Sequence, residues 1–221
     1  MNIHTKTHAS SSRKGIQINA LMRNVYALLS ILMGITALSA FSAASFGMPL
    51  MPWWAVLLGF YGLLFLTEAT KNSVLGLVFV GFLACFMGAT LSPVLHLIAG
   101  AGMNHVIVTA FSAMAITFLS LSVYTLYSKK DFRGMGHFLF VGILVAFLAG
   151  IGAIVFQLPA LSLAVSAIFV LLMSGLIMYQ TSSMIHEPNQ NYITVTVGLF
   201  VALYNLFTSL LHLLFAFGGD D

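Results

Sequence analysis

The sequence predicts an all-α, polytopic membrane protein: a bundle of seven transmembrane helices with the N-terminus in the cytoplasm and the C-terminus outside. Hydrophobic residues make up 60% of the 221 residues and charged residues only 6%. Soluble domains carry about a quarter charged residues, so a soluble fold could not bury this much apolar surface. The number of long apolar stretches and the placement of the basic residues complete the prediction.

Seven apolar stretches are long enough, or nearly so, to cross the membrane, because a transmembrane helix needs about 20 residues. Breaking sequences separate them, such as "FGMPLMP" after the first, "SKKDFRGMG" after the fourth and "HEPNQN" after the sixth. Helices are expected because backbone groups cannot stay unpaired in lipid, and the alternating strands of a membrane barrel are absent. We predict helices at residues 22–45, 52–69, 74–98, 104–127, 136–157, 160–184 and 192–217.

The chain divides into three predicted parts. Residues 1–21 form a flexible cytoplasmic tail, residues 22–217 the seven-helix membrane domain, and residues 218–221 a short external tail. The first 20 residues are polar, Ser-rich and basic, which is typical of a flexible segment. The apolar stretch that follows exceeds the 7–15 residues of a signal-peptide core, so we expect an uncleaved anchor.

The orientation follows from the eight Lys and Arg residues. With seven spans, all eight lie on one side of the membrane, which the positive-inside rule assigns to the cytoplasm. Basic residues scattered over short connections give no signature of nucleic-acid binding. They precede the first span or lie at its start, or they connect spans two to three and four to five: Lys6, Arg13, Lys14, Arg23, Lys71, Lys129, Lys130 and Arg133.

Ionisable residues near the spans are candidate functional groups. Glu68 and Lys71 lie three residues apart at the cytoplasmic end of the second span, where a helical ion pair is available. Either the pair closes the helix end, or Glu68 belongs to an inner gate or a proton site. His96, His105 and His212 lie toward the outside, where they are either interfacial residues or groups that respond to pH.

The seventh span carries a stripe of small and polar residues at helical spacing. Small residues allow helices to approach closely, and polar side chains can hydrogen bond between helices. The stripe is therefore either a packing surface or the wall of a polar lumen. Its members are Gly198, Ala202, Asn205, Ser209 and His212.

The sequence contains no recognisable catalytic or metal-binding constellation. A nucleophile elbow, a Gly-rich phosphate loop and a His/Glu metal pair at helical spacing are all missing. The single cysteine, Cys85, excludes an intrachain disulfide, and we interpret it as a packing residue. We therefore expect neither an enzyme nor a cofactor.

The ordered motifs of the chain resemble the Bax inhibitor-1 family, in particular its bacterial YccA-like branch. The resemblance depends on "RNVYALLS", "GATLSPVLHLIAGAGMNHVIVTAFSAMAITFLSLSVY", "QLPALSLAVSAIFVLLMSGLIMYQTSSMIH" and "NYITVTVGLFVALYNLFTSLLHLL". It covers nearly the whole chain after the tail. The resemblance implies a seven-helix bundle with the last helix near its centre, and a multi-pass protein of a bacterial inner membrane.

Two roles are implied by this resemblance. One is association with the AAA membrane protease FtsH, whose action on membrane substrates the YccA-like branch restrains. The other is a pH-sensitive leak for cations such as calcium, linked to two intramembrane Asp residues. Those two positions correspond here to Gln180 and Ala202, neither of which titrates, so the sequence departs from the leak mechanism. Under the first role, the tail would offer the protease a flexible handle.

The polar residues at the end of the sixth span are explained by their position near the membrane surface. Thr181, Ser182 and Ser183 end the span at the cytoplasmic interface, where they can bond to carbonyls of their own helix or meet water. Gln180 is the informative residue, because it keeps a hydrogen-bonding group and lacks the proton switch. Gln180, Asn205, Ser209 and His212 are the candidate polar intramembrane site.

Overall fold

The computed structural model describes the backbone of residues 3–128 and 130–218, and the side chains from residue 15 onward. Within these ranges the chain forms seven α-helices and one short 3-10 helix, and no strand. This confirms the all-α prediction. The helices are α1 (Ile3–Ser45), α2 (Trp53–Ala69), α3 (Val74–Gly100), α4 (Asn104–Ser128), α5 (Gly136–Val155), α6 (Pro159–His186) and α7 (Tyr192–Phe217), with η1 (Arg133–Met135) before α5.

Six of the seven helices are long and apolar enough to cross a membrane. The exception is α2, whose 17 residues span about 26 Å, slightly less than the roughly 30 Å of hydrocarbon. The chain is thus a multi-pass membrane protein with six clear candidate spans among its described residues. That α2 is a seventh span stays a prediction.

Local signals explain why the predicted helix ends agree with the structure to within two residues, apart from the start of α1. Pro159 occupies the first position of α6, where its missing N–H costs no hydrogen bond. The side chain of Asn191 caps α7 by accepting a 2.8 Å bond from the backbone N–H of Ile193. These signals divide the last long apolar runs where the sequence predicted.

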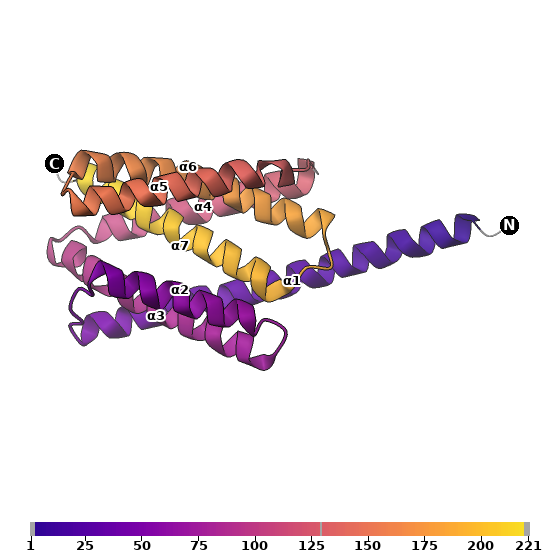
Figure 1. Cartoon of the computed structure of the whole chain (residues 1–221), viewed down its shortest axis with the longest axis horizontal. Helices are drawn as coiled ribbons and strands as arrows, with labels where there is room; N and C mark the ends of the chain where they lie inside the picture. The colour runs from indigo at the N-terminus through magenta and orange to yellow at the C-terminus, as the bar shows by residue number, and fades with distance from the viewer. Residues whose placement is uncertain (1–2, 129, 219–221) are drawn as a thin grey trace.

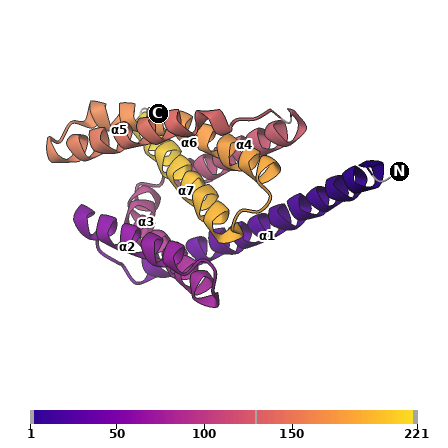
Figure 2. The same cartoon turned by 45° about the vertical axis from the view of Figure 1, so that its right-hand side comes forward.

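The start of α1 differs from the prediction, because the helix already begins at Ile3 and so includes most of the predicted flexible tail. Once the apolar part of α1 is helical, each added residue costs little, and no proline in residues 3–21 stops the extension. None of the described side chains before Leu21 is buried. Figures 1 and 2 show these first turns extending beyond the other helices.

The helices form two groups on either side of α7 (Figures 1 and 2). α1, α2 and α3 lie on one side, and α4, α5 and α6 lie on the other. α7 runs diagonally between them and packs against α1, α3, α4 and α6. Leu199, Phe200, Ala202 and Leu206 are completely buried along it. The last helix therefore has the central place that the resemblance implies.

The contact between α1 and α3 is unusually close. Gly88 of α3 lies against the backbone carbonyl of Thr36, where a β-carbon would not fit. Thr36 Oγ1 lies 3.2 Å from the carbonyl oxygen of Ala84, and Ser39 Oγ donates a 2.6 Å bond to the carbonyl of Cys85. By contrast, α1 and α4 pack closely on α7 and only sparsely on each other, where Tyr26 of α1 meets Phe118 of α4.

The start of α1 and the end of α7 lie at opposite ends of the bundle (Figure 1). The α2–α3 turn, the α4–α5 connection and the α6–α7 turn share the end at which α1 enters the bundle (Figure 1). Lys71, Lys130 and Arg133 therefore lie at one end, as the charge pattern predicted. That this end faces the cytoplasm stays a prediction, since the bundle contains no marker of the membrane side.

Candidate functional site

The polar stripe of α7 divides between buried and partly exposed positions. Ala202 and Ser209 are buried, Asn205 is half-buried and His212 is exposed. The amide of Asn205 donates a 2.8 Å bond to the carbonyl of Val201 in its own helix. The structure therefore does not gather these side chains into one polar lumen.

Gln180 of α6 meets this stripe at Gly198. The end of the Gln180 side chain lies directly against the glycine, in space that a β-carbon would otherwise fill. Ala202 follows Gly198 by one helical turn, so positions 180 and 202 belong to the same α6–α7 interface. The two positions to which the family resemblance assigned acids thus lie at one interface here, occupied by an amide and a methyl group.

His212 is paired with a residue that the sequence analysis missed. Its Nδ1 lies 2.8 Å from Ser166 Oγ of α6, and that hydroxyl also lies 3.0 Å from the carbonyl of Ser162. A hydroxyl has one hydrogen. If Ser166 donates it to Ser162, it accepts a bond from His212, and the serine is not activated as a nucleophile. The contact ties α6 to α7.

The end of α6 is built differently from the prediction. Thr181, Ser182 and Ser183 are all buried rather than in contact with water. Ser182 Oγ accepts a 3.0 Å bond from the backbone N–H of Phe132, and it lies 3.3 Å from the carbonyl of Lys130. It therefore holds the α4–α5 connection, and it also lies 3.4 Å from His186 Nδ1 of its own helix. Sequence reasoning missed this role because the partners are about 50 residues apart.

Thr181 belongs to a small group of buried hydroxyls. The hydroxyl of Tyr26 on α1 faces those of Ser122 on α4 and Thr181 on α6. In the described part of the chain none of the three makes a hydrogen bond of good geometry. Buried polar groups are usually paired, so this point between three helices is locally unsatisfied.

A charged network lies beside Ser182. Arg133 bonds to Asp131 at 2.7 Å and to Glu187, at the end of α6, at 2.6 Å. The bonds from Arg133 hold the pKa of the Asp131 carboxyl well below its usual range, and these carboxylates raise the pKa of Arg133. Gln190 Nε2 donates a 2.7 Å bond to Glu187 and so extends the network into the α6–α7 turn.

The predicted ion pair of Glu68 and Lys71 is present, and it reaches a second helix. Thr194 Oγ1 of α7 donates a 3.0 Å bond to Glu68. The side-chain amide of Asn191 donates bonds to the carbonyl of Lys71, at 3.0 Å, and to Asn72. The pair thus helps to join the α2–α3 turn to α7, which is a structural role. A gating role for it remains a proposal.

Together these bonds tie three connections at the end of the bundle where α1 enters. No cluster of three His, Cys, Asp or Glu side chains that could hold a metal ion occurs among the described residues. The hydrogen bonds and ion pairs of this network hold the three connections together and resist their separation.

Tyr204 of α7 lines three cavities, of which the α1–α4 cavity and the α2–α5 cavity are the larger two. The α1–α4 cavity measures about 490 Å³, and the α2–α5 cavity, which Asn205 also lines, about 400 Å³. The hydroxyl of Tyr204 donates a 3.2 Å bond to the carbonyl of Met87. A tyrosine in the middle of a span needs a partner for its hydroxyl, and this signal in the sequence could have identified Tyr204.

Comparison with known proteins gives an independent result. The family model described as inhibitor of apoptosis-promoting Bax1 matches residues 18–219. The chain is 40% identical over 206 residues to an uncharacterized protein of Pseudomonas aeruginosa, with 93% of each chain covered. It is 38% identical over 211 residues to the protein named modulator of FtsH protease YccA of Escherichia coli K12, which covers 96% of this chain and 94% of the relative. An uncharacterized membrane protein of Vibrio cholerae is 31% identical over 223 residues.

Proposed function

The chain belongs to the Bax inhibitor-1 family, and we propose that it is a non-enzymatic inner-membrane protein that binds an FtsH-like AAA protease and restrains its action on membrane proteins. One observation carries this proposal. Alignment with the Escherichia coli relative named as a modulator of FtsH protease extends over nearly the full length of both chains. The matched region includes the central helix and the connections that the polar network joins.

The exposed start of α1 supports this proposal. The described side chains before Leu21 are unburied, and the first turns lie outside the bundle (Figure 2). Exposed terminal segments are where proteases gain access to a chain. The basic residues of this segment favour the cytoplasmic side, where the protease domain would reach it.

The tied end of the bundle supplies a mechanism for restraint. The N-terminal segment leads directly into a part of the bundle where Arg133, Ser182, Glu68 and Asn191 join separate connections. A protease that engages the segment would then pull against these bonds and the buried α7. A chain that is easily engaged and slowly extracted occupies the enzyme and delays its other substrates.

Reconstitution tests this proposal. A purified FtsH-like protease and a labelled membrane substrate are placed in proteoliposomes with the full chain, with a chain lacking residues 2–14, or with a chain in which residues 2–14 are replaced by a Gly/Ser segment of equal length. We expect the full chain to slow substrate cleavage, the deletion to lose much of this effect, and the Gly/Ser variant to retain it. Equal cleavage in all reactions, with or without the chain, would refute the proposal.

A cation leak is the second candidate, because Asn205 contributes a polar group to the α2–α5 cavity beside the central helix. The residues at positions 180 and 202 weaken it, since neither is acidic. Calcium or proton flux into liposomes decides between the two. A flux that disappears in Asn205→Leu but persists in Ala167→Leu would favour the leak.

A further inference from the structure

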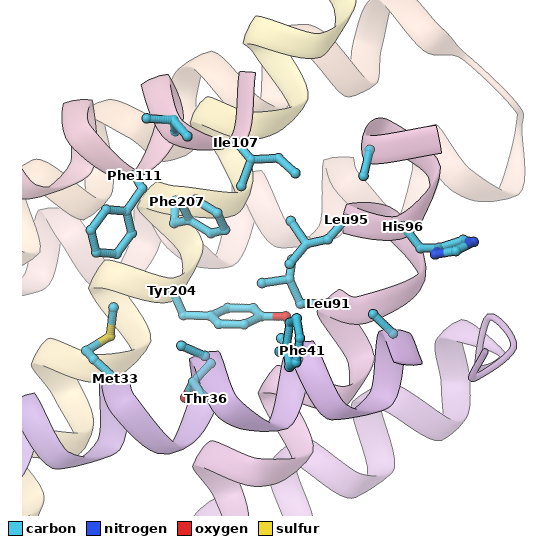
Figure 3. Close-up of a pocket in the computed structure, with 15 residues that line it drawn as sticks. Met33, Thr36, Phe41, Leu91, Leu95, His96, Ile107, Phe111, Tyr204 and Phe207 are labelled. Atoms are coloured by element: carbon cyan, nitrogen blue, oxygen red, sulfur yellow. The ribbon is translucent and has the colours of Figure 1, made fainter. Parts of the chain in front are cut away.

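The α1–α4 cavity is a lateral groove with a defined floor and end. Its floor is formed by Tyr204 and Phe207 of α7, and α3 closes it with Leu91 and Leu95 (Figure 3). It exists because α1 is drawn toward α3 at Gly88 while the contact between α1 and α4 is sparse. Its volume of about 490 Å³ lies in the range of ligand-binding pockets.

The walls of the groove suit an apolar occupant only. Thr36 Oγ1 lies 2.9 Å from the carbonyl of Leu32, and the Tyr204 hydroxyl is bonded to Met87. Both polar groups are therefore satisfied without a ligand. The remaining walls are almost entirely hydrocarbon, with small side chains from α1 such as Ala37 leaving the space open. Apolar cavities of this kind exclude water and accept apolar molecules.

The length of the groove indicates which apolar occupant it suits. Along α1 the lining runs from Met33 to Ala44, which is about 16 Å of helix and close to half of the roughly 30 Å hydrocarbon core. One acyl chain of one leaflet has this length. A transmembrane helix has to cross the whole core and would be about twice as long as the groove.

We propose that this groove binds one acyl chain of a phospholipid from the leaflet at the α3–α4 end of the bundle. The mouth is lined by Phe41, Val108 and Phe111, which are 54–75% exposed and in a membrane would face lipid tails. His96 lies on the rim with its ring pointing away from the groove (Figure 3), near the end of α3, where a headgroup phosphate can accept its N–H. The site is separate from the contact with a protease and does not depend on it.

Lipid retention by the full-length protein tests this proposal. The chain is extracted from membranes, washed in detergent and analysed by native mass spectrometry, together with Ala37→Leu and Ala167→Leu. Both alanines are exposed, but Ala37 lines the groove, whereas Ala167 on α6 lines none of the cavities named here. We expect one retained phospholipid in the wild type and Ala167→Leu, and about tenfold less in Ala37→Leu. Equal retention in all three, or retention of detergent alone, would overturn the proposal.

Fluorescence provides a second measurement that does not depend on purification losses. Trp53 and Trp54 are replaced by Phe, and Phe111→Trp then reports from the mouth of the groove. Phospholipids brominated along the chain should quench this tryptophan at low lipid-to-protein ratios, and adding Ala37→Leu should shift the quenching to about tenfold higher ratios. Identical quenching curves with and without Ala37→Leu would mean that only bulk lipid reaches the position.

Discussion

The side-chain amide of Gln180 on α6 lies directly against the backbone of Gly198 on α7, in space that a β-carbon at position 198 would fill. The glycine is thus what allows an uncharged amide to lie between the two helices. A second glycine, Gly88 on α3, has a similar place against the carbonyl of Thr36. The two contacts differ in kind, since one neighbour is a flexible side chain and the other a fixed helix backbone.

Gly88→Ala should destabilise the protein more than Gly198→Ala. The Thr36 carbonyl cannot move without shifting α1, whereas the Gln180 amide can rotate away. We expect Gly88→Ala to lower the free energy of unfolding by about 1–3 kcal/mol. Unfolding experiments in mixed detergent micelles measure this change in the free energy of unfolding. Gly81→Ala is the control, since a β-carbon there meets nothing within 4 Å. An equal loss in Gly88→Ala and Gly198→Ala would mean that Gln180 is held rigidly.

The helices could be predicted because their ends are decided by local residues. Pro159 and Asn191 act within one turn of the helix that they begin, and a sequence shows such neighbours directly. The Glu68–Lys71 pair was predictable for the same reason, since both residues share one helix end. The start of α1 was not, because the polar segment contains no residue that stops a helix growing from the apolar part.

The candidate site was harder to predict because its bonds join distant parts of the chain. Ser182 bonds to the backbone of Phe132, and Arg133 bonds to Glu187, 54 residues away. Composition places these residues near one membrane surface, but only the packing of α4, α5 and α6 decides which of them meet. The groove between α1 and α4 depends on packing in the same way.

Restoring the two acids tests whether their loss separates this chain from leak-forming relatives. Ala202 is fully buried and Gln180 lies in the same α6–α7 interface, so Gln180→Asp with Ala202→Asp places two carboxylates between these helices. We expect little calcium flux from the wild type in liposomes, and in the double variant a flux that grows as pH rises and the carboxylates ionise. Gln180→Asn with Ala202→Ser is the uncharged control. If the double variant shows no flux, the missing acids are not what separates this chain from leak-forming relatives.

Asp131→Asn should change how stability depends on pH. Because Arg133 lowers the pKa of Asp131, the folded protein keeps this carboxylate ionised at a pH where the unfolded chain, with a pKa near 3.9, binds a proton. The stabilisation is therefore fully present above about pH 4, and it is lost as pH falls through the lowered pKa. Melting temperatures between pH 3 and pH 7 should show a constant deficit in Asp131→Asn at higher pH that shrinks in acid. A deficit that grows in acid would contradict the assigned direction.

Removing either of two adjacent buried hydroxyls at the end of α6 should change the free energy of unfolding differently. Thr181 and Ser182 are both completely buried, but only Ser182 bonds to a backbone N–H, that of Phe132. Ser182→Ala leaves this N–H unpaired and should lower the free energy of unfolding by about 1–3 kcal/mol. Thr181→Val keeps the shape and removes a hydroxyl without a well-formed bond, so it should be neutral or stabilising.

Chemical unfolding of both variants beside the wild type measures these differences. Protease sensitivity of the α4–α5 connection provides a local readout, because Ser182→Ala should release it and Thr181→Val should not. A loss in Thr181→Val equal to that in Ser182→Ala would mean that the Thr181 hydroxyl is bonded within the group it forms with Tyr26 and Ser122. If so, the double variant Thr181→Val with Tyr26→Phe should lose no more free energy of unfolding than Thr181→Val alone. The reason is that the two hydroxyls would share one interaction.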